Sequence, residues 1–388
     1  MTTMSSDRRA RRLPSLTGMR FLAAFTVFAT HVGLEDYYRS ARVDTDLLHQ
    51  GLDLGWTGVE FFFVLSGFVL TWSASPSDTP RLFWRRRIVK IYPNQLVSWT
   101  LALVLALTLT SQITPIQFVP SLFLLHTWIP SNAALKSLNL PSWSLCSEVL
   151  FYFLFPWLLR LVNKIREDRL WLAAGATVAL IAVVPVFARF ALPGGRLAPF
   201  DMSFSQHWVV YELPLSRLPD FVLGVIMARI VKAGRWIRIG MLPALGLLVV
   251  GCAVQYAADL TVWAPTLPVA IPVALVIAAG ATADVRGTAS VFRHRIMIWL
   301  GEISFAFFML HYLVVHYTHV LIGVNRQFSL VDGTLLILAL LLGSILAAWL
   351  LYRFVETPAM RRWSRPKRRV ESPAVADIEP ESVVARTR

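Results

Sequence analysis

The sequence predicts an all-α polytopic membrane protein with about ten transmembrane helices and both termini in the cytoplasm. Three observations predict this fold class: the composition, ten long apolar windows and the placement of basic residues. Charged residues make up only 15% of the 388 residues and hydrophobic residues make up 56%, whereas soluble domains average about 25% charged residues. A soluble globule with this composition would lack the polar surface to cover its interior, and a disordered chain would lack the apolar residues.

Apolar windows define the predicted spans, because a helix needs about 20 mostly apolar residues to cross the hydrocarbon core. A further apolar segment, 115–129, is short and interrupted by proline, which favours a surface-lying or re-entrant helix. The sixth to eighth windows are short or contain prolines. The ten windows lie near residues 14–33, 55–74, 91–110, 143–162, 170–190, 216–232, 240–257, 264–283, 297–320 and 333–354.

The basic residues account for the formal net charge of +14. With the N-terminus in the cytoplasm, 29 of the 37 Lys and Arg residues fall on the cytoplasmic side, six fall on the opposite side and two lie inside spans. This asymmetry follows the positive-inside rule and supports ten spans. A basic protein is also a candidate for nucleic-acid binding, but here the charges are spread over six segments with no recognition motif. We therefore expect no nucleic-acid partner.

The predicted domain organisation has three parts. Residues 1–13 form a basic cytoplasmic N-terminus, and the following apolar run lacks a cleavage signal, so it is expected to be retained as the first span. Residues 14–357 form the membrane domain of a multi-pass protein of the cell membrane. Residues 358–388 form a cytoplasmic tail that is basic and then disordered, because its end lacks apolar periodicity.

The first span contains two ionisable residues, Arg20 and His31, and such residues inside a bilayer usually mark function. A separation of eleven residues returns to within about 20° of the same helix face and spans about 16 Å along the axis. This arrangement suits an elongated anionic substrate whose reactive end reaches the imidazole. The alternative is that Arg20 extends to the interface and His31 forms a hydrogen bond within the bundle.

The second span and the loop after it contain further candidates. Ser66 and Gly67 are small residues that allow the close approach of a neighbouring helix or a substrate, and Ser66 is kept as a candidate binding residue. Arg86, Arg87 and Lys90 follow the span. Guanidinium groups bind phosphate oxygens in a bidentate manner, while the alternative role of these cations is to set topology and contact anionic lipid.

The fourth span begins with a polar stripe. Ser144, Glu148 and Tyr152 are spaced four residues apart on an otherwise apolar helix. A buried carboxylate needs a partner, and His31 or an arginine is the expected one. A carboxylate that orients an imidazole is the arrangement of a general-base pair, and the alternative is a structural ion pair.

The ninth span contains His311, and His316 and His319 lie near its far end. No motif such as His-Glu-x-x-His is present, so no metal site is expected. At the cytoplasmic end of the last span, Glu356 is expected to pair with Arg353 or with the basic tail.

Six segments, in order along most of the chain, resemble the acyltransferase 3 family of integral membrane O-acyltransferases. The resemblance implies about ten spans and transfer of an acyl group from cytoplasmic acyl-coenzyme A to a hydroxyl, with no tightly bound cofactor. It does not specify an oligomeric state. The segments are SLTGMRFLAAFTVFATH, GVEFFFVLSGF, RRRIVKIYP, PSWSLCSEVLFYFLFP, GEISFAFFMLH and YRFVETPA.

The family's motif positions carry over to individual residues of this chain. His31 is implied to be the general base on the acceptor hydroxyl, with Glu148 holding and charging its imidazole. An acyl-His intermediate is the alternative, because histidine is also a nucleophile. The arginines are implied to bind the phosphates or the thioester region of the donor, and the late histidine is a candidate binding residue. The matching positions are Arg20, His31, Arg86, Arg87, Glu148 and His311.

The chain departs from the family pattern in three places. Glu60 stands where aspartate is common, Lys90 replaces a frequent arginine, and no extracytoplasmic hydrolase-like domain is expected after the last span. The compact length and the segment GVEFFFVLSGFVLTWS resemble the actinomycete branch that acylates macrolide antibiotics, including at the 3-hydroxyl. The alternatives are an O-acetyltransferase of a cell-surface polysaccharide or glycolipid, and a transporter, which would be expected to show internal repeats.

Overall fold

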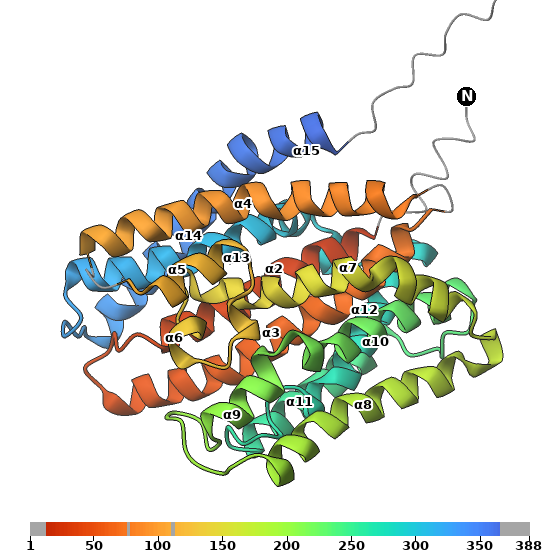
Figure 1. Cartoon of the computed structure of the whole chain (residues 1–388), viewed down its shortest axis with the longest axis horizontal. Helices are drawn as coiled ribbons and strands as arrows, with labels where there is room; N and C mark the ends of the chain where they lie inside the picture. Colours follow the sequence, from red (N-terminus) through yellow and green to blue (C-terminus); the bar gives the residue numbers. More distant parts are fainter. Residues whose placement is uncertain (1–12, 76–77, 110–112, 365–388) are drawn as a thin grey trace, which may run out of the picture.

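Helices account for the architecture of the described chain, which comprises residues 13–75, 78–109 and 113–364 of a computed structural model (Figure 1). In this part of the chain the only β-structure is two isolated bridges. The all-α prediction is therefore confirmed. Most of the predicted basic N-terminus, residues 1–12, and most of the predicted tail, residues 365–388, lie outside the described residues.

Ten helices of at least 17 residues coincide with the ten predicted windows within the described ranges. Several begin earlier than the windows do, because a hydropathy window excludes the polar turns at a helix end. Their bounds are α2 (Pro14–Gly33), α3 (Ala41–Ser73), α4 (Pro80–Leu109), α7 (Trp143–Asn163), α8 (Leu170–Ala191), α10 (Pro214–Lys232), α11 (Met241–Ala257), α12 (Leu267–Arg286), α13 (Arg295–Ile322) and α14 (Leu330–Leu351).

Seven of these helices are long and apolar enough to cross a membrane: α3, α4, α7, α8, α12, α13, and α14 with its continuation. Of the other three, α2 and α10 carry ionisable residues that lower their mean hydropathy, and α11 has only 17 residues. The structure thus supports seven candidate spans. The count of ten and the cytoplasmic placement of both termini stay predictions.

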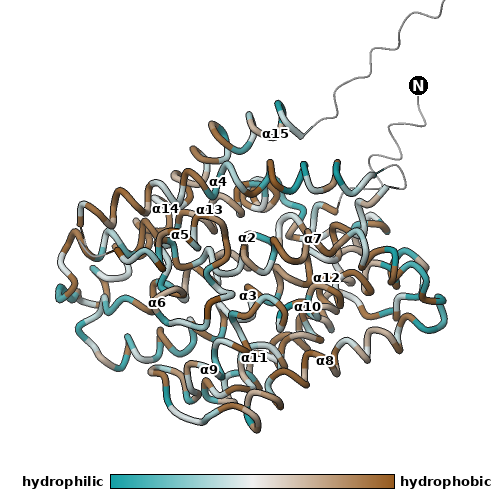
Figure 2. Tube along the Cα trace, in the orientation of Figure 1, coloured by the Kyte–Doolittle hydropathy of each residue, from teal (hydrophilic) through white to brown (hydrophobic). Residues whose placement is uncertain are grey.

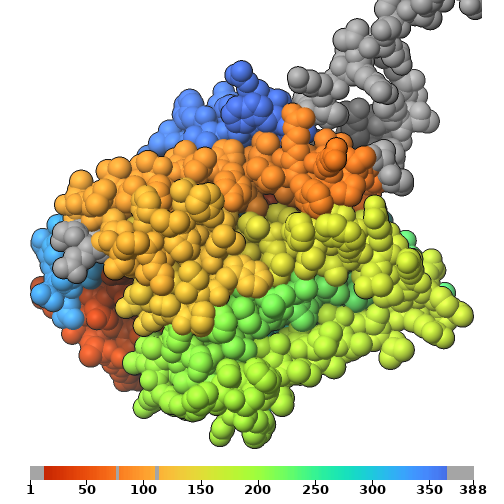
Figure 3. Space-filling model, viewed as in Figure 1, coloured from red at the N-terminus to blue at the C-terminus, as the bar shows by residue number. Residues whose placement is uncertain are grey.

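Short helices connect the long ones. The apolar segment expected to lie on the surface or to re-enter forms α5 (Pro115–Leu122), which has eight residues and is too short to cross a bilayer. It is followed by α6 (Asn132–Leu135), and α9 (Phe204–His207) precedes α10. After α14, a π-helical turn leads into α15 (Thr357–Trp363), which lies beside α4 (Figures 1 and 3).

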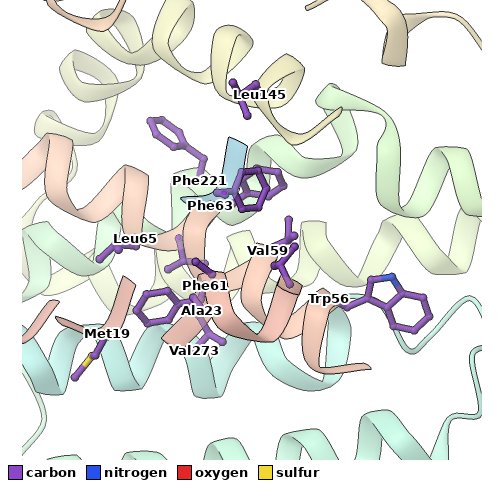
Figure 4. Packing of buried hydrophobic residues seen from close by; sticks show 14 of the residues in the cluster. Met19, Ala23, Trp56, Val59, Phe61, Phe63, Leu65, Leu145, Phe221 and Val273 are labelled. Carbon is purple, nitrogen blue, oxygen red and sulfur yellow. The ribbon is translucent and has the colours of Figure 1, made fainter. Parts of the chain in front are cut away.

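The centre of the bundle is formed by α2, α3, α10 and α13, which pack most extensively on one another. Side chains from α2, α3, α10 and α12 meet there, among them Met19, Phe61, Phe221 and Val273 (Figure 4). The peripheral helices instead expose apolar side chains, and Figure 2 shows hydrophobic colour along the helices with hydrophilic stretches toward their ends. This pattern is typical of helices that face lipid.

Two glycines allow α3 and α10 to cross at very short range. A Cβ atom added at Gly67 would lie 2.0 Å from the Phe221 carbonyl oxygen, and one added at Gly224 would lie 1.9 Å from the Val64 oxygen. Small residues at such crossings let membrane helices approach closely. Gly67 therefore packs against a neighbouring helix rather than a substrate.

A buried ion cluster joins the same two helices. Arg217 Nη2 on α10 lies 2.7 Å from Glu60 Oε2 on α3 and 3.2 Å from Asp220 Oδ2, and each side chain is at most 1% exposed. The guanidinium also lies 5.2 Å from the centre of the Phe63 ring. Removing one partner from a buried pair leaves an uncompensated charge, so Glu60 serves here to hold α3 against α10.

Candidate active site

A cavity of about 120 Å³ lies between the central helices and α4 and α7. One part of its wall is polar and cationic, and the rest is made by aromatic and aliphatic side chains. Its lining residues are Arg20 from α2, Val59, Phe62 and Phe63 from α3, Arg87, Lys90 and Ile91 from α4, Ser144, Leu145, Glu148 and Tyr152 from α7, and Phe305 and Phe308 from α13.

The polar stripe predicted on the fourth span lines this cavity. Ser144, Glu148 and Tyr152 reach it from successive turns of α7, as their four-residue spacing requires. The Tyr152 hydroxyl donates a hydrogen bond of 2.9 Å to Glu148 Oε2 and accepts one of 3.3 Å from Ser66 Oγ on α3. Ser66 is therefore not in the cavity wall but one hydrogen bond behind it.

Lys90 is neutralised by a carboxylate from the other end of the chain. Its Nζ atom forms an ion pair with Glu356, and Asn94 Nδ2 donates to the second oxygen of that carboxylate at 2.5 Å. The expected pairing of Glu356 with Arg353 or the tail is wrong for the residues that the structure describes. The cause is the π-helical turn Tyr352–Glu356, which aims the buried carboxylate toward α4.

Arg20 and Arg87 differ from Lys90, because no hydrogen bond or ion pair joins either guanidinium to another described residue. Arg87 lies only against aromatic rings, 5.9 Å from the centre of Phe83 and 5.8 Å from that of Tyr152. Both line the cavity. Neither guanidinium forms a hydrogen bond or ion pair with the Glu148 carboxylate that lines the same cavity, and free guanidinium groups have the chemistry to bind anions with several acceptor oxygens.

Arg86, unlike Arg87, does not line the central cavity. Its Nη2 and Nη1 atoms lie 2.9 Å and 3.1 Å from the two carboxylate oxygens of Asp78, and it lines a separate surface hollow together with Arg160. Arg86 and Arg87 both line that surface hollow, but adjacent residues on a helix are about 100° apart, and only Arg87 also lines the central cavity. The structure brings Arg87 to the predicted site but not Arg86.

His31 is buried on α2 and is joined to His311 on α13. His31 Nδ1 lies 2.8 Å from the Val27 carbonyl oxygen and 3.0 Å from His311 Nε2, while His311 Nδ1 lies 3.1 Å from the Phe307 oxygen. A carbonyl only accepts, so neutral His311 carries its proton on Nδ1 and accepts at Nε2. His31 then carries its proton on Nδ1, which leaves the Nε2 lone pair available as a base.

The expected pair of His31 and Glu148 is not formed. In the described part of the chain no hydrogen bond or ion pair joins the two residues, and the carboxylate binds Tyr152 instead. The two residues lie at different levels of the helix bundle. Glu148 lines the cavity beside Arg20, whereas His31 lies about 16 Å farther along α2 than Arg20 does. His311, not Glu148, is the side chain that lies within hydrogen-bond distance of the His31 imidazole.

Aromatic rings link the cavity to the histidine pair. Phe308 lines the cavity, and its ring centre lies 5.9 Å from that of His311 and 5.7 Å from that of Phe62. Phe308 therefore lies between the cavity and the buried histidine pair.

Glu35 is a residue near the site that the sequence reasoning missed. Its carboxylate lies 2.7 Å from His316 Nδ1 and 3.7 Å from His319 Nε2, just beyond the end of α2. Within the described residues no group of three or more His, Cys, Asp and Glu side chains is arranged to hold a metal. The sequence holds one clue to Glu35, which is that it lies four residues, or one helical turn, after His31.

Comparison with known proteins identifies the family of the chain. The acyltransferase 3 family, described as an acyltransferase domain, matches residues 13–353. The chain is 38% identical over 382 residues to Acyltransferase MdmB of Streptomyces mycarofaciens, which covers 96% of this chain and 97% of that protein. It is 24% identical over 375 residues to Peptidoglycan O-acetyltransferase OatA of Listeria monocytogenes serovar 1/2a, which covers 89% of this chain and 55% of that protein.

No solved structure gives a significant match to the chain. The family match nonetheless spans nearly the whole described region, and the relative from Streptomyces is similar over nearly its full length. The transporter alternative is therefore set aside. The chain belongs to the acyltransferase 3 family and is a membrane-integral O-acyltransferase.

Proposed function

We propose that this enzyme transfers an acyl group from acyl-coenzyme A to a hydroxyl of a macrolide antibiotic, the 3-hydroxyl in the first instance, or of a related secondary metabolite. The observation that carries the proposal is the pair of unpartnered guanidinium groups, Arg20 and Arg87, in a cavity next to a histidine pair. Coenzyme A combines phosphates with a long flexible arm, and the site combines cations with a base about 16 Å away.

Arg20 and Arg87 would bind the pyrophosphate of the donor, because guanidinium groups give charge-assisted bidentate hydrogen bonds to phosphate. Glu148 and Tyr152 would fix the geometry of that wall, since the carboxylate and the phenol are hydrogen-bonded to each other. The arm of the donor would then extend past Phe308 toward His31. Glu148 thus acts in donor binding in this proposal rather than on the imidazole.

The transfer step follows from the protonation state of His31. Its Nε2 atom removes the proton from the acceptor hydroxyl as the oxygen attacks the thioester carbonyl carbon. The carbon–sulfur bond then breaks, the ester is released, and the proton on Nε2 passes to the coenzyme thiolate. His311 keeps His31 in the reactive tautomer by accepting the Nδ1 hydrogen at 3.0 Å.

An acyl-His31 intermediate is the alternative chemistry, because the same Nε2 lone pair can attack the thioester directly. Incubating the enzyme with radiolabelled acyl-coenzyme A and no acceptor separates the two routes. Direct transfer predicts no label on the protein after rapid acid quenching. Stoichiometric labelling that disappears on addition of acceptor would establish the two-step route.

The likeness to Acyltransferase MdmB extends over nearly the whole length of both proteins. The chain spans only about half of OatA, which is named as a peptidoglycan O-acetyltransferase. The second candidate is therefore O-acetylation of a cell-surface polysaccharide or glycolipid.

The test is an assay of the purified enzyme in lipid nanodiscs with acetyl- and propionyl-coenzyme A. A macrolide with a free 3-hydroxyl, a peptidoglycan fragment and a glycolipid are offered as acceptors, and products are identified by mass spectrometry. We expect a macrolide ester that depends on acyl-coenzyme A. Acylation of the carbohydrates alone would overturn the macrolide assignment, and no transfer from any acyl-coenzyme A would overturn the donor.

A further inference from the structure

Three adjoining hollows form a groove around the C-terminal end of α3. Their volumes are about 470, 490 and 450 Å³, and Ala74 lines all three. The first hollow also shares Arg87 with the central cavity. The groove therefore reaches Arg87, one of the two cations at which the donor is proposed to bind.

The groove is strongly basic. Six cationic side chains line it, against the two carboxylates of Asp78 and Glu167, and Asp78 is already paired with Arg86. Such a surface attracts a ligand with several negative charges. The cationic residues are Arg86, Arg87, Arg160, Arg229, Lys232 and Arg286.

The far hollow adds two indole rings to these charges. Trp72 and Trp236 line it and are half-buried, and Lys232 Nζ lies 5.6 Å from the centre of the Trp72 ring. Partly exposed aromatic rings beside cations are the usual platform for a nucleobase, because each base presents a flat face for stacking. Trp72 already stacks on Phe68 and Trp236 on Trp171, so the groove offers phosphate contacts along its length and, at its end, indole rings that would extend an existing aromatic stack.

We infer that this groove binds the 3′-phosphoadenosine end of acyl-coenzyme A, with adenine at Trp72 and Trp236 and the 3′-phosphate at Arg160 and Arg229. The pyrophosphate then lies near Arg87, where the groove meets the cavity. This inference rests on the proposed donor and adds the part of the protein that recognises its nucleotide.

A second hollow, of about 690 Å³, adjoins the cavity on its other side through Arg20 and Lys90. It suits the nucleotide less well, because two carboxylates, Glu302 and Glu356, line it together with one further cation, Arg361. Charge complementarity therefore places the polyanionic nucleotide in the groove around α3.

Anionic lipid headgroups are the other source of phosphate for basic residues at a membrane surface. A lipid headgroup supplies phosphate but no purine base and no arm that enters the cavity. Nanodiscs made with and without anionic lipid therefore distinguish the two sources.

The experiment compares acyl-coenzyme A with acyl-pantetheine, which carries the same acyl group and thiol arm without the nucleotide. The double variant R160Q/R229Q is expected to lose at least tenfold in kcat/KM for acyl-coenzyme A, because two charge-assisted contacts are removed. Its kcat/KM for acyl-pantetheine should stay unchanged, which also shows that the variant is folded. Trp236→Leu should behave in the same way. The control Arg295→Gln removes an exposed cation outside the groove and should affect neither donor.

Equal use of the two donors by the unaltered enzyme, or an equal loss on both donors in R160Q/R229Q, would overturn the nucleotide site while leaving the proposed donor intact. A selective loss that disappears in nanodiscs without anionic lipid would assign the groove to lipid phosphate and overturn it as well. Failure of the unaltered enzyme to use either donor would instead overturn the proposed function on which the site rests.

Discussion

At the scale of single residues, the difference between paired and unpaired cations defines the site. Lys90 is neutralised by Glu356, and Arg86 by Asp78, whereas Arg20 and Arg87 face the cavity without a carboxylate partner among the described residues. The sequence predicts that all four cations lie near the cytoplasmic ends of their helices. It does not distinguish their roles, because the partners come from remote or differently oriented segments.

Arg20→Gln and Arg87→Gln are each expected to raise the KM for acyl-coenzyme A about tenfold or more, because each removes a charge-assisted contact to phosphate. Initial rates over a range of donor concentrations measure this effect. Arg85→Gln is the matched control, since Arg85 lies on the same helix but is exposed and lines none of the hollows described above. Unchanged KM values for acyl-coenzyme A in both test variants would show that the donor does not bind in this cavity.

His311 is a positioning residue in this account, because it acts through His31. His311→Phe should lower kcat at least tenfold with little change in donor KM, since His31 Nδ1 loses one of its two acceptors and keeps only the Val27 carbonyl oxygen. His311→Gln restores an acceptor oxygen at a similar distance along the side chain and should recover part of kcat. If the two variants lose kcat equally, or if donor KM rises instead, His311 does not act through the tautomer of His31.

At the scale of elements, the apolar windows predict the helices but not where they begin. The second window starts near residue 55, whereas α3 begins at Ala41, and the third starts near residue 91, whereas α4 begins at Pro80. Those first turns are rich in polar residues, so hydropathy marks only the apolar part of each helix. Sequence periodicity also does not predict the π-helical turn before α15, although this turn determines which residue Glu356 contacts.

The crossing of α3 and α10 gives a stability prediction. Gly224→Ala would place a methyl group 1.9 Å from a backbone oxygen, so the helices must separate, at a cost of about 1–3 kcal/mol. Gly175→Ala on α8 is the matched control, because nothing lies within 4 Å of the added atom. Thermal unfolding in detergent should show a lower midpoint for Gly224→Ala only. Equal midpoints for the two variants would mean that α3 and α10 leave room for a methyl group at their crossing.

At the scale of the whole molecule, composition and the distribution of basic residues predict the membrane-integral, all-helical class. The arrangement of the site could not be predicted in the same way. The cavity draws on five helices that are far apart in sequence, and the partner of His31 proves to be His311 rather than Glu148. Helical periodicity gives the face of one helix but not which neighbour that face meets.

The predicted topology makes a direct test of orientation possible, because α7 separates two exposed positions, Lys136 and Arg166. A membrane-impermeant thiol reagent applied to intact cells should label Lys136→Cys and not Arg166→Cys, which should react only after the membrane is opened. The unaltered protein, with Cys146 buried and Cys252 half-buried, gives the background. The reverse labelling pattern would place the termini on the outer side.

If His31 is the base that activates the acceptor hydroxyl, the variant His31→Ala should lose the transfer step, which a single-turnover assay measures. The purified variant and the unaltered enzyme are mixed with acyl-coenzyme A and acceptor in nanodiscs, and donor binding is measured on the same samples. We expect the variant to transfer about 10²–10⁴-fold more slowly with donor affinity within about twofold, because the cation site lies about 16 Å from His31. A folded His31→Ala variant that transfers at a near-normal rate would show that His31 is not this base.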